Sequence, residues 1–135
     1  MRVLLDTNVL ASAIATRGLC ADVLRVVLAE HQLLLCDQIC AELDRVLADK
    51  FDLPAELIAG FAWLLRRDAL HVQAGHPPAV TLDDSDDLGI LAAAVAGRAD
   101  VLVTGDRELQ RLGGVAGIAI LSPRQFWTRL RSPPP

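Results

Sequence analysis

Short apolar runs alternate along this chain with stretches in which apolar residues recur every three or four positions, and this alternation limits the possible folds most strongly. Such runs are typical of strands that are buried on both faces, and the periodic stretches are typical of amphipathic helices. When a strand, a helix and another strand follow one another, the two strands usually pair in parallel. The sequence therefore predicts an α/β fold with a parallel sheet and helices on both faces.

The individual elements follow from these patterns and from the capping residues at their ends. We expect strands at residues 2–5, 33–36, 70–73, 101–103 and 118–121. We expect helices at residues 7–14, 21–30, 38–48, 54–65, 87–96 and 123–130. Asp37 is predicted to cap the helix that follows it and is given no catalytic role, and Asp86 is a candidate cap for the helix that begins at Asp87.

A length of 135 residues and a hydrophobic share of 53% suit one domain with its own core. We place this domain at residues 1–130 and a disordered tail at residues 131–135. The N-terminus lacks the apolar segment of a signal peptide, and no apolar stretch approaches the ~20 residues that cross a bilayer. The three cysteines lack the spacing of a disulfide or zinc framework. We therefore expect a cytoplasmic protein with no membrane partner.

Acidic residues recur where the predicted strands end. Asp6 ends the first strand, and Asp106 follows the strand at residues 101–103 after a Thr-Gly step. Ligands of parallel α/β sheets gather at these carboxyl ends. Glu42 lies at the flank of the apolar face of its predicted helix, from which its side chain can reach such a site. A further acidic group spans residues 83–87.

Carboxylates that converge in one cleft raise each other's pKa unless a cation lies between them. A hard divalent cation, Mg²⁺ or Mn²⁺, prefers such oxygen ligands. One or two of these ions can generate hydroxide and stabilise an in-line displacement at phosphorus. The sequence thus favours metal-dependent phosphodiester hydrolysis. Asp83 and Asp84 are as consistent with a solvated loop as with a role in this site, and Asp86 is as consistent with a helix cap.

Four polar segments follow one another in a recognisable order and spacing. They are Asp6-Thr7-Asn8, Ala41-Glu42-Leu43, Asp86-Asp87-Leu88 and Thr104-Gly105-Asp106. Together they resemble the motifs of the PIN-domain ribonucleases, and the most similar branch is that of VapC-like toxins from toxin-antitoxin pairs. The resemblance extends from Val3 to Trp127. The family commonly has Asp-Pro where this chain has Asp84-Ser85, a departure that affects loop stiffness more than chemistry.

The resemblance implies a three-layer α/β/α fold with a central parallel sheet and an RNA-cleaving site that uses Mg²⁺ or Mn²⁺. It implies that the catalytic and metal-binding acids are Asp6, Glu42, Asp87 and Asp106. It also implies that Asn8 and Thr104 support the site by orienting Asp6 and a water molecule. Asp84 and Asp86 are candidates for further supporting groups or for ligands of a second ion.

The resemblance also implies three partners, namely an RNA substrate, a small antitoxin that blocks the site, and a second copy in a homodimer. The net charge of −4 disfavours nucleic acid as a partner at first sight, because phosphate binding is driven by basic groups. Acidic residues predominate in residues 1–90, however, and basic residues predominate after them. Arg107 is the best candidate for a phosphate contact because it adjoins Asp106.

Two other functions stay open at this point. An aspartate-based phosphotransfer domain of the dehalogenase type needs a second aspartate two residues after the first, but position 8 is Asn, and Lys50 is the only lysine. A catalytically silent PIN domain that binds RNA or acts as a scaffold is favoured by loss of a metal-binding acid. All four acids are present in this chain.

Overall fold

The computed structural model describes residues 1–132. Within them lies a six-stranded sheet with the order β3-β2-β1-β4-β6-β5. Its strands are β1 (Arg2–Leu5), β2 (Gln32–Leu35), β3 (Leu70–His71), β4 (Val101–Val103), β5 (Gly114–Val115) and β6 (Ile118–Leu121). The pairs β1–β2, β1–β4, β2–β3 and β4–β6 are parallel, whereas β5 pairs with β6 in the antiparallel direction. The predicted central parallel sheet is confirmed.

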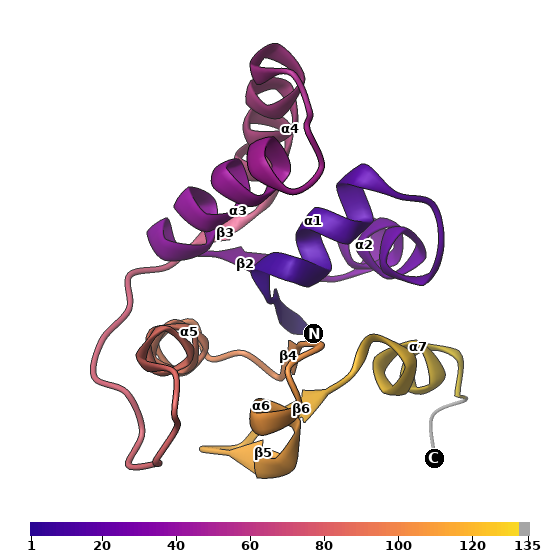
Figure 1. Ribbon diagram of the computed structural model, residues 1–135. Helices are drawn as coiled ribbons and strands as arrows, with labels where there is room; N and C mark the ends of the chain where they lie inside the picture. Colours follow the sequence, from indigo (N-terminus) through magenta and orange to yellow (C-terminus); the bar gives the residue numbers. More distant parts are fainter. Residues whose placement is uncertain (133–135) are drawn as a thin grey trace.

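Helices cover both faces of this sheet. They are α1 (Thr7–Ala15), α2 (Leu19–Glu30), α3 (Asp37–Asp49), α4 (Ala55–Asp68), α5 (Ser85–Ala96), α6 (Arg107–Leu112) and α7 (Pro123–Arg131). Val3, Leu4 and Leu5 are consecutive in β1 and fully buried, which requires cover on both faces because successive side chains of a strand point in opposite directions. Figure 1 shows α1 to α4 in the upper half of the view and α5 to α7 in the lower half. The predicted three-layer α/β/α architecture is thus confirmed.

The strand order reverses at β1. The chain places β2 and then β3 on one side of β1, crosses back, and places β4 on the other side. Leu5 of β1 pairs with Val103 of β4, and the backbone N–H of Asp6 donates to the Val103 carbonyl at 2.9 Å. The crevice outside the carboxyl ends of strands at such a reversal is the usual ligand site of open α/β sheets. The fold therefore brings Asp6 beside the segment that follows β4.

Two short elements, α6 and β5, are absent from the sequence prediction, and a third, β3, is shorter than predicted. Helix α6 spans only six residues and β5 only two, so neither is long enough for its periodicity to stand out from the surrounding loops. Gly113 ends α6 with a backbone φ of 66°, a conformation that glycine adopts without a steric penalty. Strand β3 ends at His71, earlier than the predicted 70–73.

Two helix caps also differ from prediction. Cys36, with an extended backbone, is the N-cap of α3, and Asp37 is the first helical residue, with its carboxylate 2.8 Å from Nε2 of His71. Asp84 caps α5 by accepting a hydrogen bond from the Asp86 N–H at 2.9 Å. The sequence predicted Asp37 as the cap of the first helix and offered Asp86 as a candidate cap of the second. A cap has non-helical backbone angles, which follow from the path of the preceding chain and not from residue type alone.

Helix α7 begins as its sequence predicts. Ser122 accepts a hydrogen bond from the Gln125 N–H, the Gln125 side chain accepts one from the Ser122 N–H, and Pro123 occupies the first turn. The helix ends at Arg131, the first residue of the predicted tail, and residues 133–135 of that tail lie outside the described residues. No helix within residues 1–132 combines the length and apolarity needed to cross a bilayer.

Candidate active site

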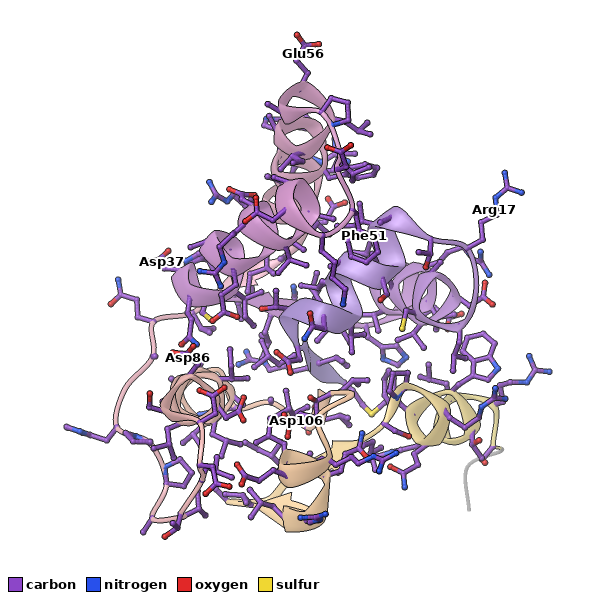
Figure 2. All side chains as sticks on the ribbon, viewed as in Figure 1. Arg17, Asp37, Phe51, Glu56, Asp86 and Asp106 are labelled. Atoms are coloured by element: carbon purple, nitrogen blue, oxygen red, sulfur yellow. The ribbon has the colours of Figure 1, made fainter. Side chains whose placement is uncertain are left out.

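A cavity of about 400 Å³ opens at the carboxyl ends of β1 and β4. Its walls come from α1, α3, the start of α5 and the loop that follows β4. The lining residues are Asp6, Thr7, Asn8, Glu42, Arg45, Val46, Asp84, Asp86, Asp87, Ile90, Gly105 and Asp106. In Figure 2, Asp86 lies at α5 and Asp106 at α6, whereas Glu56 projects from the tip of α4, far from both. Carboxylates from four parts of the chain therefore share one cavity.

Asp6 is the N-cap of α1, and each of its two carboxylate oxygens accepts a hydrogen bond. Oδ1 accepts the backbone N–H of Thr7 at 2.7 Å, and Oδ2 accepts the hydroxyl of Thr104 at 2.8 Å. Burial raises the pKa of Asp6, the two hydrogen bonds oppose this rise, and the carboxylates of Glu42 and Asp106 add to it. The position of Asp6 is thus fixed, while no ion pair within residues 1–132 stabilises its ionised form.

Glu42 reaches the cavity from α3, and each of its oxygens has a partner. The hydroxyl of Thr7 donates to Oε2 at 2.8 Å, and Nε2 of Gln38 donates to Oε1 at 2.9 Å. Thr7 follows Asp6 directly in the chain, so the turn that positions Asp6 also orients Glu42. The carboxylates of Asp6 and Glu42 are thus coupled through Thr7, which lies 35 residues before Glu42 in the chain.

Asp106 lies at the start of α6 and is tied to Asp6 through Thr104. The fully buried Thr104 accepts the Asp106 N–H at 3.0 Å while its hydroxyl donates to Asp6. The Asp106 side chain caps α6 by accepting the Leu109 N–H at 3.0 Å, and the Gln110 amide donates to the Thr104 carbonyl at 2.7 Å. The Thr-Gly-Asp turn is therefore held on both sides.

Asp87 lies in the first turn of α5 and has the most perturbed carboxylate of the cavity. Its Oδ2 is buried and has no hydrogen-bond partner among the described residues. Burial, the largest cause, together with the carboxylates of Asp106, Asp84, Asp6 and Glu108, raises the pKa of Asp87 to about 6. A buried polar atom without a partner is rare, and a catalytic role or a bound water or ion is among the explanations for one.

Residues 2–108 match the family model of the PIN domain. This chain belongs to the PIN-domain family. No curated protein matches the chain in sequence. Among solved structures, the PIN domain is similar to VapBC2 from Rickettsia felis bound to a DNA fragment from their promoter, with a TM-score of 0.64 and 17% identity over 89% of this chain and 97% of that chain.

A second solved structure has the same fold. VapBC-1 from nontypeable Haemophilus influenzae, determined at 2.2 Å resolution, gives a TM-score of 0.64 with 19% identity over 92% of this chain and 99% of that chain. At these levels of identity the two comparisons establish the PIN fold only. The chemistry of this chain has to be inferred from its own residues. The PIN domain here has the four acids whose surroundings are described above.

Of the other predicted site residues of the PIN domain, three line the cavity and one does not. Asn8 is exposed and lines the cavity, and Asp84 and Asp86 line it from the start of α5. Asp84 acts there as a helix cap. Arg107 is exposed as the first residue of α6 and is not among the residues that line the cavity within residues 1–132.

Sequence reasoning missed three polar residues that the structure brings to the site. Thr7 and Gln38 bind Glu42 through hydrogen bonds, and Arg45 lines the cavity from the same helix. Arg45 lies three positions after Glu42 and Gln38 lies four positions before it, so helical spacing places all three on one face. That spacing is the sequence signal that could have identified Gln38 and Arg45, whereas Thr7 lies on α1 and is brought to Glu42 only by the fold.

The donor atoms of the PIN cavity suit a hard divalent cation. Within residues 1–132 no three Asp, Glu, His or Cys side chains form a ready cage for a metal. Mg²⁺ does not require one, because it commonly takes one or two protein carboxylates and keeps several waters. The lining offers oxygen ligands and no histidine, and Oδ2 of Asp87 is buried without a partner. Asp6, Glu42, Asp87 and Asp106 are the residues that could hold the ion.

Thr104→Val should lower the free energy of unfolding by about 1–3 kcal/mol at neutral pH. Valine keeps the shape of threonine but removes the hydroxyl that joins Asp6 to the Asp106 N–H. Urea denaturation in EDTA measures the loss, and Thr128→Val on the exposed face of α7 is the matched control, with a change within about 0.5 kcal/mol. Equal midpoints for the two variants would show that the Thr104 hydroxyl contributes little.

Proposed function

We propose that this PIN-domain protein is a Mg²⁺- or Mn²⁺-dependent endoribonuclease that hydrolyses RNA phosphodiester bonds. The observation that carries the proposal is the convergence of Asp6, Glu42, Asp87 and Asp106 on one cavity with no ion pair to any of them among the described residues. Such a group of carboxylates is stable only when a cation or protons reduce their repulsion. Divalent cations with oxygen ligands are the cofactors used for in-line displacement at phosphorus.

Each polar residue then has a part in the reaction. A bound ion supplies a strongly polarised water and stabilises the charge that develops at phosphorus. Asp6, Glu42, Asp87 and Asp106 hold that ion, and the hydroxyls of Thr104 and Thr7 keep Asp6 and Glu42 oriented toward the cavity. The exposed amide of Asn8 lines the same cavity and can orient a water or a phosphate oxygen. The protein thereby contributes preorganised geometry.

A cleavage assay separates this function from the two alternatives. Purified protein is incubated with end-labelled single-stranded RNA in Mg²⁺, Mn²⁺ or EDTA. A ribonuclease cleaves only with the metal. A silent RNA-binding or scaffold domain retards the RNA in a gel without cleaving it, and an aspartate-based phosphotransfer domain leaves RNA intact but takes up phosphate from acetyl phosphate. Either of these last two results would replace the proposed function.

Arg45 is the basic residue that we propose as a contact for RNA phosphate at the cavity. Arg45 is exposed and lines the cavity, and its guanidinium forms no ion pair or hydrogen bond within residues 1–132. An unpaired guanidinium beside a group of carboxylates is available for a bidentate bond to a phosphate. Arg107, which follows Asp106 at the start of α6 and is not among the residues that line the cavity within residues 1–132, is a second candidate.

Arg45→Gln should raise the KM for RNA about three- to tenfold and leave kcat within about twofold, the effect of losing one exposed phosphate contact worth ~1 kcal/mol. The slope of log affinity against log salt should fall by about 0.7, the value for one phosphate contact on a single strand. Steady-state kinetics at several salt concentrations measure both effects. A larger loss for Arg107→Gln than for Arg45→Gln would place the phosphate contact on α6 instead.

We further propose that the protein is the toxin of a toxin-antitoxin pair, forms a homodimer and acts in the cytoplasm. Support comes from the fold, which is shared with two VapBC assemblies. Support for a protein partner comes also from α4, where Leu57, Trp63 and Leu64 are 46%, 62% and 45% exposed. Exposed apolar side chains that lie together are typical of interaction surfaces. Co-purification with the product of a neighbouring small reading frame tests this assignment.

A further inference from the structure

Gln38 forms a bridge between the two helices that bound the cavity. Its Nε2 donates to Oε1 of Glu42 at 2.9 Å, within α3, and to the backbone carbonyl of Asp86 at 2.9 Å, in the first turn of α5. A carboxamide nitrogen has two hydrogens, so both bonds form at once. The second bond spans 48 residues of sequence and joins the helix of Glu42 to the turn that contains Asp87.

This bridge depends on the absence of a side chain at position 89. A Cβ added at Gly89 would collide with the carboxamide of Gln38, and all three of its nearest neighbours are atoms of that side chain. Gly89 lies inside α5, where glycine costs about 1 kcal/mol relative to alanine. A glycine at a helix-interior position is therefore explained here by the space that the Gln38 side chain occupies.

We propose that Gln38 is a positioning residue that orients Glu42 and couples it to the acidic first turn of α5, with Gly89 leaving room for the bridge. The inference rests on the proposed metal-dependent function, because its consequence is a better-organised set of metal ligands. Glu42 is held on both sides, by Thr7 at Oε2 and by Gln38 at Oε1. Loss of Gln38 leaves Oε1 without its partner and α5 without its side-chain contact to α3.

Residues that orient metal ligands commonly change metal affinity by about 10–100-fold when mutated. We therefore expect Gln38→Ala and Gly89→Ala each to weaken Mn²⁺ binding about tenfold or more in isothermal titration. Gln38→Met, which keeps most of the volume and loses the donor, should behave like Gln38→Ala. Gly60→Ala is the matched control, since Gly60 lies inside α4 and a Cβ there meets nothing within 4 Å.

The double variant distinguishes loss of the Gln38 bridge from an independent effect of alanine at position 89 on α5. In Gln38→Ala/Gly89→Ala the collision is gone, so the double variant should bind Mn²⁺ no more weakly than Gln38→Ala alone, because the two changes act through one contact. Its thermal stability should equal or exceed that of Gln38→Ala, since alanine is the better helix former at position 89. Additive losses, or wild-type Mn²⁺ affinity in Gln38→Ala or Gln38→Met, would overturn the proposal.

A second readout is independent of metal. In metal-free protein, amide hydrogen exchange in residues 89–92, whose N–H groups bond to the carbonyls of the first turn of α5, should be faster in Gln38→Ala than in wild type and unchanged in Gly60→Ala. Unchanged exchange in Gln38→Ala would overturn the bridge whatever the activity. If wild type itself neither binds Mn²⁺ nor cleaves RNA, the proposed function fails, and faster exchange in Gln38→Ala still supports the bridge.

Discussion

Asp6→Asn should reduce RNA cleavage by about a hundredfold or more, which corresponds to a loss of several kcal/mol of transition-state stabilisation. The amide keeps the shape of the carboxylate and still caps α1, because its oxygen can accept the Thr7 N–H. It removes one negative charge from the cavity and so weakens the hold on a divalent cation. The measurement is the rate of cleavage of end-labelled RNA at saturating Mn²⁺, together with a circular dichroism spectrum of each variant.

The matched control for this prediction is Asp44→Asn. Asp44 lies on α3, two positions from Glu42, and is exposed outside the lining of the active-site cavity. It carries the same change of charge without a predicted role, so its cleavage rate should stay within about twofold of wild type. Full activity in a correctly folded Asp6→Asn protein would remove Asp6 from the active site and, with it, the basis of the proposed function.

Asp87→Asn should stabilise the metal-free protein at neutral pH. The pKa of Asp87 is raised from 3.8 to about 6 in the folded protein, chiefly by burial. Its ionised form therefore disfavours folding, and the cost grows as the pH rises from about 4 to 6 and is constant above that. After allowance for the partial exposure of the side chain, we expect a gain of about 1–2 kcal/mol for the variant at pH 7.5.

Urea denaturation in EDTA at pH 4, 5, 6 and 7.5 tests this prediction. The difference between Asp87→Asn and wild type should fall to a small part of its pH 7.5 value by about pH 4, because the cost of ionising the carboxyl disappears only below the unfolded pKa of 3.8, where it is protonated in both states. Adding Mn²⁺ should then stabilise wild type more than the variant, because a ligand that binds the folded state raises its stability. A variant that is less stable than wild type at pH 7.5 in EDTA would contradict the assigned strain at Asp87.

Together, loss of cleavage in Asp6→Asn and greater stability of metal-free Asp87→Asn would show that acids needed for cleavage lower the stability of the metal-free fold. A native carboxylate that destabilises the free protein is expected where a cation is meant to bind. Thr104→Val should change the stability in the opposite direction, because it removes hydrogen bonds that stabilise the fold around the same site. The acids and the residues that support them therefore make separable contributions to stability.

Much of the fold could be predicted from local sequence. The buried runs that became β1, β4 and β6 have the predicted bounds, because a wholly apolar run next to a helical pattern has few alternatives in an α/β chain. Helix α6 and strand β5 could not be predicted in this way. They are short, and they form because the chain after Asp106 must turn back to pair with the edge of the sheet.

The candidate site also contains residues that the sequence identified and residues that it did not. Asp6 and Asp106 stood out from the sequence because an acid at the end of a buried strand needs a physical explanation. The helix caps of α3 and α5 were assigned to the wrong residues, since a cap depends on backbone angles that the neighbouring elements impose. Arg45 and Gln38 carry no local signal beyond their helical spacing from Glu42.

By itself, the sequence determined the alternation of strands and helices and the set of acids at the strand ends, because both depend on the order of residue types along the chain. The tertiary structure alone decided which groups meet. Thr104 reaches Asp6 across 98 residues, Thr7 reaches Glu42 across 35, and Gln38 reaches Asp86 across 48. Such contacts arise only when strand register and helix packing bring distant side chains within hydrogen-bond range, which no local pattern encodes.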